Sequence, residues 1–194
     1  MCGRYYVDDE TAREIEKVVR EAEAKLQICH RGDICPSSHA AVLTGKKPQL
    51  TAEEMIWGFP NDQRKGLLIN ARAESVLEKR TFRDSVLHRR CIIPARQFYE
   101  WDSDRNRVTF SREDSSVLFM AGCYQMFQNQ ERFVILTTQA NVSVEKVHDR
   151  MPVILEPKEL EDWIYDDEYL EFALRKTPVL LKHDQEYEQL NLFS

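Results

Sequence analysis

The chain has 194 residues, of which 42% are hydrophobic and 31% are charged. This length suits one domain with a sizeable core. The longest apolar run, residues 117–124, is too short for a membrane-spanning helix, and no apolar signal core follows the N-terminus. We therefore expect a cytoplasmic protein with no membrane contact. Five cysteines without a C-x-x-C pair disfavour a disulfide framework and a zinc knuckle, so we expect free thiols and no metal.

The net charge of -6 is unusual for a protein that binds nucleic acid, but the charge is unevenly distributed. Residues 156–188 contain 11 acidic and 4 basic side chains, so the remainder of the chain has a net charge of +1. Within that remainder, one run has a single acid, Asp84, among six basic side chains: Lys79, Arg80, Arg83, Arg89, Arg90 and Arg96. Such a run is usually a solvated surface, but it can also bind phosphate.

The first half of the chain predicts a strand, a helix and further strands. A strand over residues 2–7 would hold the N-terminus in the body of the fold. Apolar residues spaced three and four apart predict an amphipathic helix from Asp8 or Asp9 to about Leu26. After a loop over residues 27–38, we expect strands at 39–44, 52–59 and 67–70, then a helical segment over 73–90.

The second half predicts an antiparallel sheet followed by helices. Strands are expected at 91–101, 106–111, 116–124 and 132–138, then a helical turn to Val147 and a strand at 153–155. Helices are expected at 158–164 and from Asp166 or Asp167 to about Leu174, and the chain from Gln185 onward resembles a tail. We predict one α+β domain over residues 1–188, with a mainly antiparallel, barrel-like sheet flanked by helices. Residues 156–188 would form an acidic helical cap.

Cys2 is the first candidate for chemistry. If Met1 is removed, Cys2 carries a thiol and a free α-amine, which together can convert an aldehyde to an imine and then to a thiazolidine ring. Unperturbed pKa values of about 8 for the amine and about 8.5 for the thiol leave both groups partly reactive near neutrality. A cysteine near a terminus can also be accidental, so Cys2 alone does not establish such a site.

Three further polar residues fall outside the packing pattern. Glu100 follows an apolar strand and lies among aromatic residues, where burial would raise its pKa toward the range useful for proton transfer; it could equally face solvent. His148 follows a helical turn and is either structural or an acid–base group. Asn70 lies at the end of a short predicted strand, where it is either a turn former or a catalytic amide. Three arginines could be surface ions: Arg4, Arg72 and Arg150.

Five separated segments become informative when they are taken together: residues 1–4, the Trp57-Gly58 pair, residues 69–74, residues 91–101, and residues 136–155 from Leu-Thr-Thr through His-Asp-Arg-Met-Pro-Val-Ile-Leu. In this order they resemble the SOS response-associated peptidase (SRAP) family, the abasic-site crosslinking proteins. The resemblance spans residues 1 to about 165.

The resemblance implies a monomer that binds single-stranded DNA during the response to DNA damage, at the nucleoid or the replication fork. Its Cys2 would capture the ring-opened aldehyde of an abasic site as a thiazolidine, with lyase- or hydrolase-type chemistry and no cofactor. Asn70 would position the N-terminal residue, and Glu100 and His148 would transfer protons. The resemblance also implies a set of residues that contact DNA, in which the arginines would hold phosphates and the tryptophans would lie near bases. The implied set is Gly3, Arg4, Trp57, Arg72, Arg80, Trp101, Thr137 and Arg150.

Three segments need separate treatment. The loop at residues 33–36 has aspartate where the family usually has asparagine, so the resemblance does not carry over a DNA contact from this loop. The segment after Gly58 is short, so we expect a groove that is narrower or more open there. Residues 189–194 form a tail that resembles the peptides by which bacterial repair proteins dock on the DNA sliding clamp, although an apolar strand explains it equally well. The matching residues are Gln189, Leu190, Leu192 and Phe193.

Two other function classes remain open. The chain could be an N-terminal-nucleophile cysteine peptidase that uses Cys2 on its own leader or on other peptides, or a non-catalytic binder of single-stranded nucleic acid. The crosslinking hypothesis requires an exposed aminothiol at Cys2 that lies beside Glu100 and His148 in a cationic cleft.

Overall fold

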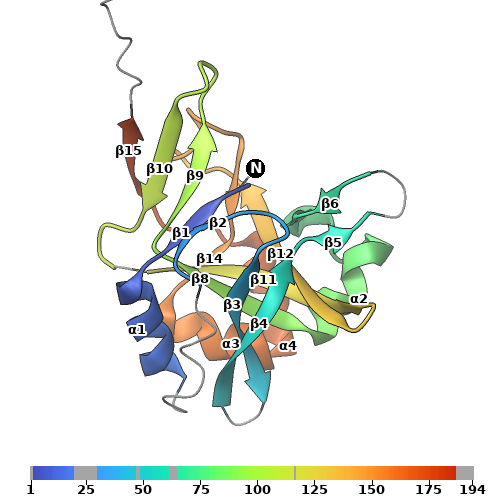
Figure 1. Cartoon of the computed structure of the whole chain (residues 1–194). Coiled ribbons are helices and arrows are strands. Elements are labelled where there is room, and N and C mark those ends of the chain that lie inside the picture. Colours follow the sequence, from blue (N-terminus) through green and yellow to red (C-terminus); the bar gives the residue numbers. More distant parts are fainter. Residues whose placement is uncertain (1, 20–29, 47–48, 62–64, 116, 187–194) are drawn as a thin grey trace, which may run out of the picture.

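The computed structural model describes residues 2–19, 30–46, 49–61, 65–115 and 117–186. They form one α+β domain, in which a barrel lies beside a second, smaller sheet and helices cover the outside (Figure 1). No helix among these residues is long and apolar enough to cross a membrane.

The barrel is a closed ring of strands. It contains β3 (His39–Lys46), β4 (Gln49–Trp57), β8 (Arg90–Ala95), β11 (Leu118–Phe127) and β12 (Gln130–Gln139). Around the ring, β12 pairs with β4, β4 with β3, β3 with β8, β8 with β11, and β11 again with β12. The ring therefore has no open edge. The β12–β4 pairing is parallel and the others in the ring are antiparallel. The predicted barrel-like and mainly antiparallel sheet is confirmed.

Several short strands extend this barrel toward the N-terminus of the chain. Strand β7 (Asn70–Arg72) runs parallel to β12, and β13 (Arg150–Pro152) pairs with the end of β12. Strand β14 (Ile154–Leu155) pairs with β11, and β5 (Phe59–Pro60) forms a hairpin with β6 (Leu67–Leu68). Strands β7 and β13 therefore bring two distant segments to one end of β12.

The second sheet has the strand order β15-β10-β9-β1-β2. Its members are β1 (Tyr5–Val7), β2 (Gly32–Ile34), β9 (Gln97–Trp101), β10 (Arg107–Ser111) and β15 (Lys182–Glu186). The predicted tail does not begin at Gln185, because residues 182–186 pair with β10 and so satisfy main-chain groups along its edge. The clamp-like peptide lies outside the described residues.

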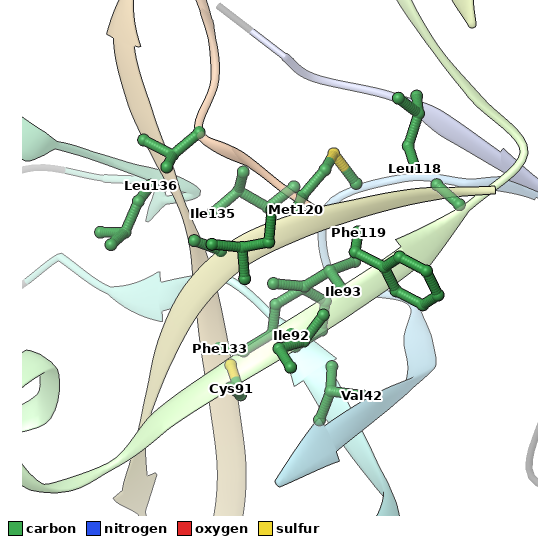
Figure 2. Packing of buried hydrophobic residues seen from close by; sticks show 14 of the residues in the cluster. Val42, Cys91, Ile92, Ile93, Leu118, Phe119, Met120, Phe133, Ile135 and Leu136 are labelled. Atoms are coloured by element: carbon green, nitrogen blue, oxygen red, sulfur yellow. The ribbon is translucent and has the colours of Figure 1, made fainter. Parts of the chain in front are cut away.

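Apolar side chains from β8, β11 and β12 fill the barrel (Figure 2). Ile92, Met120, Phe133 and Ile135 each have no exposed surface. Burying a side chain of this kind contributes about 1.5–3 kcal/mol, so the barrel supplies a rigid support for the short strands at its end.

Helix α1 (Asp9–Val18) begins at Asp8, whose carboxylate accepts a hydrogen bond from the amide of Thr11. It ends before the predicted Leu26, because Val19 has an extended backbone; residues 20–29 lie outside the described part of the chain. The helical segment expected over 73–90 consists of a 3-10 turn, η2 (Ala73–Ser75), and α2 (Arg80–His88).

The acidic region folds mainly as the predicted helices. A 3-10 turn, η3 (Pro157–Glu159), leads into α3 (Leu160–Tyr165), and Asp166 caps α4 (Asp167–Arg175) through the amide of Glu168. Helices α3 and α4 lie in the lower part of the view in Figure 1. Helix α4 packs against η2, and its residues Glu171 and Arg175 line a surface pocket with Glu74.

Candidate active site

Strand β7 carries Asn70 to the start of the chain. Its side-chain Nδ2 donates a hydrogen bond of 2.9 Å to the main-chain oxygen of Cys2. The strand is fixed on one side by β12, where Ile135 is the register partner of Asn70. On the other side, the indole N–H of Trp57 donates to the oxygen of Ile69 at 2.9 Å. The predicted neighbours Cys2 and Asn70 are thus in direct contact.

The thiol of Cys2 is buried, and its Sγ lies 3.8 Å from the main-chain oxygen of Arg4. Burial raises the pKa of this thiol far above its ordinary value, and the negative charge of Glu100 raises it further. The hypothesis of an exposed aminothiol concerns the chain without Met1; in the described chain the thiol of Cys2 is buried. At neutral pH the thiol is protonated and needs a base before it can act as a thiolate.

Glu100 supplies a buried carboxylate next to Cys2. Strand β9 pairs with β1 through Tyr5 and Phe98, which brings Glu100 to the start of the chain with only 3% of its surface exposed. Burial raises the pKa of Glu100, while a positive charge on His148 lowers it. Of the two alternatives for this carboxylate, burial and exposure to solvent, the structure shows burial, and the raised pKa increases its affinity for a proton.

His148 lies between β12 and β13, on a loop whose ends those strands fix. Its main-chain N–H donates to the oxygen of Val144 at 3.1 Å, and its Nδ1 accepts a hydrogen bond of 2.9 Å from the amide of Arg150. The side chain is partly exposed. The charge of His148 acts on Glu100, and the charge of Glu100 acts on the thiol of Cys2, so Glu100 lies within electrostatic range of both predicted partners.

Arg150 lies beside this group with only 11% of its side chain exposed. Its guanidinium donates to both carboxylate oxygens of Glu74, at 2.7 and 2.8 Å, and to the main-chain oxygen of Thr137 at 2.6 Å. This pair lowers the pKa of Glu74. Thr137 is fully buried, and its Oγ1 has no hydrogen-bond partner among the described residues. Arg150 thus joins β12 to η2, and Thr137 lies underneath it.

The rim of the site combines positive charge with an aromatic surface. The Arg4 guanidinium lies 5.7 Å from the centre of the Trp101 ring, within range of a cation–π contact, and 3.6 Å from the carboxylate of Asp33. Trp101 is 39% exposed at the end of β9. Gly3, between Cys2 and Arg4, is partly exposed. This rim can bind a planar group and a phosphate next to the buried thiol.

A family model described as SOS response associated peptidase (SRAP) matches residues 1–191. The chain belongs to this family. Among curated proteins it is similar to Abasic site processing protein YoqW of Bacillus subtilis, with 29% identity over 90% of this chain and 87% of the relative. It is also similar to Abasic site processing protein YedK of Escherichia coli, with 28% identity over 84% of this chain and 79% of the relative.

Solved structures show that this SRAP chain has the fold of other bacterial proteins. A protein from Bacteroides thetaiotaomicron superposes with a TM-score of 0.81 over 96% of this chain and 93% of its own, at 19% identity. A protein from Bordetella bronchiseptica superposes with a TM-score of 0.78 over 96% of this chain and all of its own, at 24% identity. The α+β fold with a barrel-like sheet is thus shared.

The structure of this SRAP chain corrects the implied role of Trp57. Its side chain has no exposed surface, and its ring centre lies 5.2 Å from that of Tyr5 and 6.2 Å from that of Phe133. A residue enclosed in this way cannot stack on a base. Trp57 instead fixes the strand that carries Asn70. Thr137 is also too deeply buried for the direct DNA contact that the resemblance implied.

The predicted basic run over residues 79–96 is not one surface. Arg90 is buried and bonded to Asp167, Arg89 pairs with Asp84, and Arg96 lies near Asp8 and Glu10. Arg80 is exposed at the start of α2, where it lines a surface cleft with Arg83, Asp84 and Leu87. None of the other predicted site residues lines that cleft. Arg72 is exposed on β7, opposite Thr137, and so lies beside the site.

Sequence reasoning missed two acids of the site in this SRAP chain. Glu74 binds Arg150, and Asp149 lies beside His148 with its Oδ1 2.9 Å from Nδ1. Both lie in motifs that had been noted, four residues after Asn70 and one residue after His148. Their proximity to functional residues was the available signal, but a single acid next to a histidine or an arginine is common on protein surfaces.

Proposed function

We propose that this chain binds single-stranded DNA and captures abasic sites covalently, through the amine and thiol of Cys2, as a thiazolidine. The observation that carries the proposal is the arrangement around Cys2. Asn70 holds its main-chain oxygen, the buried Glu100 acts on its thiol, and His148 acts on Glu100. YoqW and YedK, to which the chain is similar, are named abasic site processing proteins, which supports abasic DNA as the substrate.

The reaction begins after removal of Met1, which leaves Cys2 with a free amine. The amine nitrogen adds to the aldehyde carbon of the opened deoxyribose and gives a carbinolamine. An acid in the site then protonates the hydroxyl group, the C–O bond breaks, and water leaves as the C=N bond forms. Addition of Sγ to this carbon closes the five-membered ring. The net change is the loss of one water molecule.

Proton transfer is the part of this sequence that the protein must supply. The thiol is protonated at neutral pH because burial raises its pKa, so ring closure requires a base that takes its proton. Burial also raises the pKa of Glu100, which makes its carboxylate a better base and its carboxyl group available as an acid. His148, whose charge acts on Glu100, can take up this proton, because the ring nitrogen keeps the hydrogen that it carried in the carbinolamine.

DNA would be held at the rim by charge and stacking. Phosphate contacts give affinity without reading sequence, which suits a protein that must find a missing base in any context. Arg72 is exposed beside the site, and Trp101 offers an aromatic surface next to Arg4. Arg150 can bind a phosphate only if the phosphate replaces Glu74, because the two side chains are paired.

A denaturing gel tests the proposal. The full chain, with removal of Met1 verified by intact mass, is incubated with a single-stranded oligonucleotide that carries one abasic site. We expect a heat-stable shifted band. The variant Cys2→Ala keeps an α-amine but lacks the thiol, so it should give a band only when borohydride reduces the imine. An oligonucleotide with a tetrahydrofuran site, which has no aldehyde, is the matched substrate control.

Each outcome of the gel separates the three function classes. No heat-stable band for the wild-type chain, with retained binding in a native gel, would overturn the crosslinking proposal in favour of simple binding. An equally stable band for Cys2→Ala would exclude the thiazolidine. A separate assay tests the peptidase alternative. Cleavage of peptide substrates that requires Cys2, by a chain that forms no crosslink to DNA, would favour it.

A further inference from the structure

The guanidinium group of Arg150 already binds an anion, the carboxylate of Glu74. Its Nη1 donates to Oε1 of Glu74 at 2.7 Å, and its Nη2 donates to Oε2 at 2.8 Å. Arginine binds two oxygens of a phosphate through the same pair of parallel hydrogen bonds. The carboxylate of Glu74 therefore occupies the positions that two oxygens of a DNA phosphate would take.

The two partners of this pair are held in place to different degrees. The Arg150 side chain is 11% exposed, and its Nη2 also donates to the main-chain oxygen of Thr137 at 2.6 Å. The main chain of Arg150 is fixed as well, because it pairs with Gln139 of β12. The Glu74 side chain is 49% exposed and belongs to the short turn η2. Since β12 holds Arg150 without help from Glu74, the carboxylate is the partner that can leave.

A second arginine acts on the same carboxylate. The hydrogen bonds from Arg150 lower the pKa of Glu74, and the positive charge of Arg72, which is exposed on β7, lowers it further. Glu74 is therefore ionised at neutral pH and repels a phosphate that approaches Arg150. A phosphate that took its place would be attracted by both arginines.

Glu74 also has space into which its side chain can turn. It lines a surface pocket of about 620 Å³, together with residues from the end of β12 and from α4. One of the lining residues is Arg175 of α4, whose side chain is 81% exposed. Rotation of the Glu74 side chain into this pocket would leave the guanidinium of Arg150 open to a phosphate.

We propose that Glu74 is a built-in competitor for DNA phosphate, which must leave Arg150 before a phosphate can bind there and which thereby weakens non-covalent binding of single-stranded DNA. This inference rests on the proposed function, because it assigns a role within the same DNA-binding site. Intact strands are then released readily, whereas an abasic strand is retained by its covalent bond to Cys2. Glu74 does not touch the reacting atoms.

Equilibrium binding tests the inference without any crosslink. An intact single-stranded oligonucleotide, and one with a tetrahydrofuran site, are titrated into the full chain at low salt. Glu74→Gln keeps the size of the side chain and removes its charge, so it should bind both oligonucleotides about three- to tenfold more tightly than the wild type. The slope of log affinity against log salt should increase in magnitude by up to about 0.7, the contribution of one further phosphate contact.

Glu78→Gln is the matched control. Glu78 is exposed and lines the same pocket, so its substitution changes the net charge by the same amount. It should leave the affinity and the slope close to those of the wild type. Equal gains for the two variants would reveal a general effect of charge and overturn the inference. Weaker binding by Glu74→Gln would also overturn it, because Glu74 would then prepare Arg150 for DNA instead of competing for it.

A double-mutant comparison tests whether the effect acts through Arg150. In an Arg150→Gln background, Glu74→Gln should bring a smaller gain in affinity, because no guanidinium is left for it to release. An undiminished gain would overturn the inference. The crosslinking gel decides the proposed function separately. If the wild type forms no crosslink while Glu74→Gln binds DNA more tightly, the capture chemistry fails and the competition at Arg150 stands. If the crosslink forms and Glu74→Gln leaves the affinity unchanged, only the inference about Glu74 fails.

Discussion

Glu100 is the residue at which stability and activity are expected to oppose each other. Burial raises its pKa, so the folded protein binds this proton more tightly than the unfolded chain does. Stability from such a group is present below the unfolded pKa of about 4.3 and is lost as the pH rises through the folded pKa. Glu100→Gln cannot ionise and should therefore be more stable than the wild type at pH 7.

Urea unfolding at several pH values checks this prediction. The difference in the free energy of unfolding between Glu100→Gln and wild type should shrink as the pH approaches about 4, where both side chains are neutral. Exposed Glu113→Gln is the control and should show no such trend. If Glu100→Gln were less stable at pH 7 and equal at low pH, the ionised carboxylate would be stabilising, and the argument from burial would be wrong.

Asn70 should affect the rate of crosslinking more than the affinity for DNA. Asn70→Ala removes the hydrogen bond to the main-chain oxygen of Cys2, which contributes about 1 kcal/mol to holding that residue in place. We expect slower crosslinking at saturating DNA and unchanged binding of an oligonucleotide with a tetrahydrofuran site. A loss of affinity without a loss of rate would show instead that Asn70 contacts the DNA.

The members of the site could be named from the sequence, but their environments could not. Asn70, Glu100 and His148 lie far from Cys2 along the chain, so their spacing says nothing about contact, and only the family resemblance grouped them. The burial of Trp57 depends on Tyr5 and Phe133, which come from other strands. The hydrogen bond from the amide of Arg150 to Nδ1 of His148 depends on the loop between β12 and β13. Such features arise from packing between distant segments.

Most strands and helices were predictable because their apolar residues repeat with a clear period. The run over residues 91–101 was predicted as one strand, yet it forms β8 in the barrel and β9 in the second sheet, with Arg96 between them. The amide of Arg96 donates to the oxygen of Tyr6 at this point. Strand β15 has the polar sequence Lys-His-Asp-Gln-Glu, and only its pairing with β10 identifies it. The period of the apolar residues does not show where the chain passes from one sheet to another, and it does not show which strands pair through their main chains.

Arg90 shows how one side chain joins two elements. It begins β8, and its guanidinium donates to the main-chain oxygens of Trp163 at 2.6 Å and Leu87 at 3.0 Å and to the carboxylate of Asp167 at 2.7 Å. Its side chain is only 4% exposed. Arg90→Ala leaves buried carbonyl groups without donors and should lower the free energy of unfolding by about 3 kcal/mol.

Urea unfolding of Arg90→Ala, compared with Arg83→Ala, tests this interpretation. Arg83 belongs to the same basic run but is exposed on α2, so its removal should change stability by no more than about 0.5 kcal/mol. Equal effects of the two substitutions would mean that the contacts of Arg90 with α3 and α4 add nothing to the fold.

At the scale of the whole molecule, acidic and basic side chains are gathered on different elements. Many of the acidic residues lie on α3 and α4, and α4 packs against η2. Exposed Arg72 on β7 and the Arg4–Trp101 pair lie near Cys2. A polyanion is attracted by the positive side chains near Cys2 and repelled by the acidic helices. The net charge of -6 is thus compatible with DNA binding, because the charges next to the bound DNA matter more than the sum over the chain.

Salt dependence of binding tests this separation through Arg72. Each phosphate contact with single-stranded DNA releases counterions, so the slope of log affinity against log salt changes by about 0.7 for each contact. Arg72→Ala should weaken binding to a single-stranded oligonucleotide at low salt and reduce the magnitude of this slope by about 0.7. Arg13→Ala removes the same charge from an exposed position on α1 and should leave both quantities unchanged. If both variants reduced the slope equally, DNA would respond to net charge alone, and the end of the molecule that contains Cys2 would not be the surface that binds it.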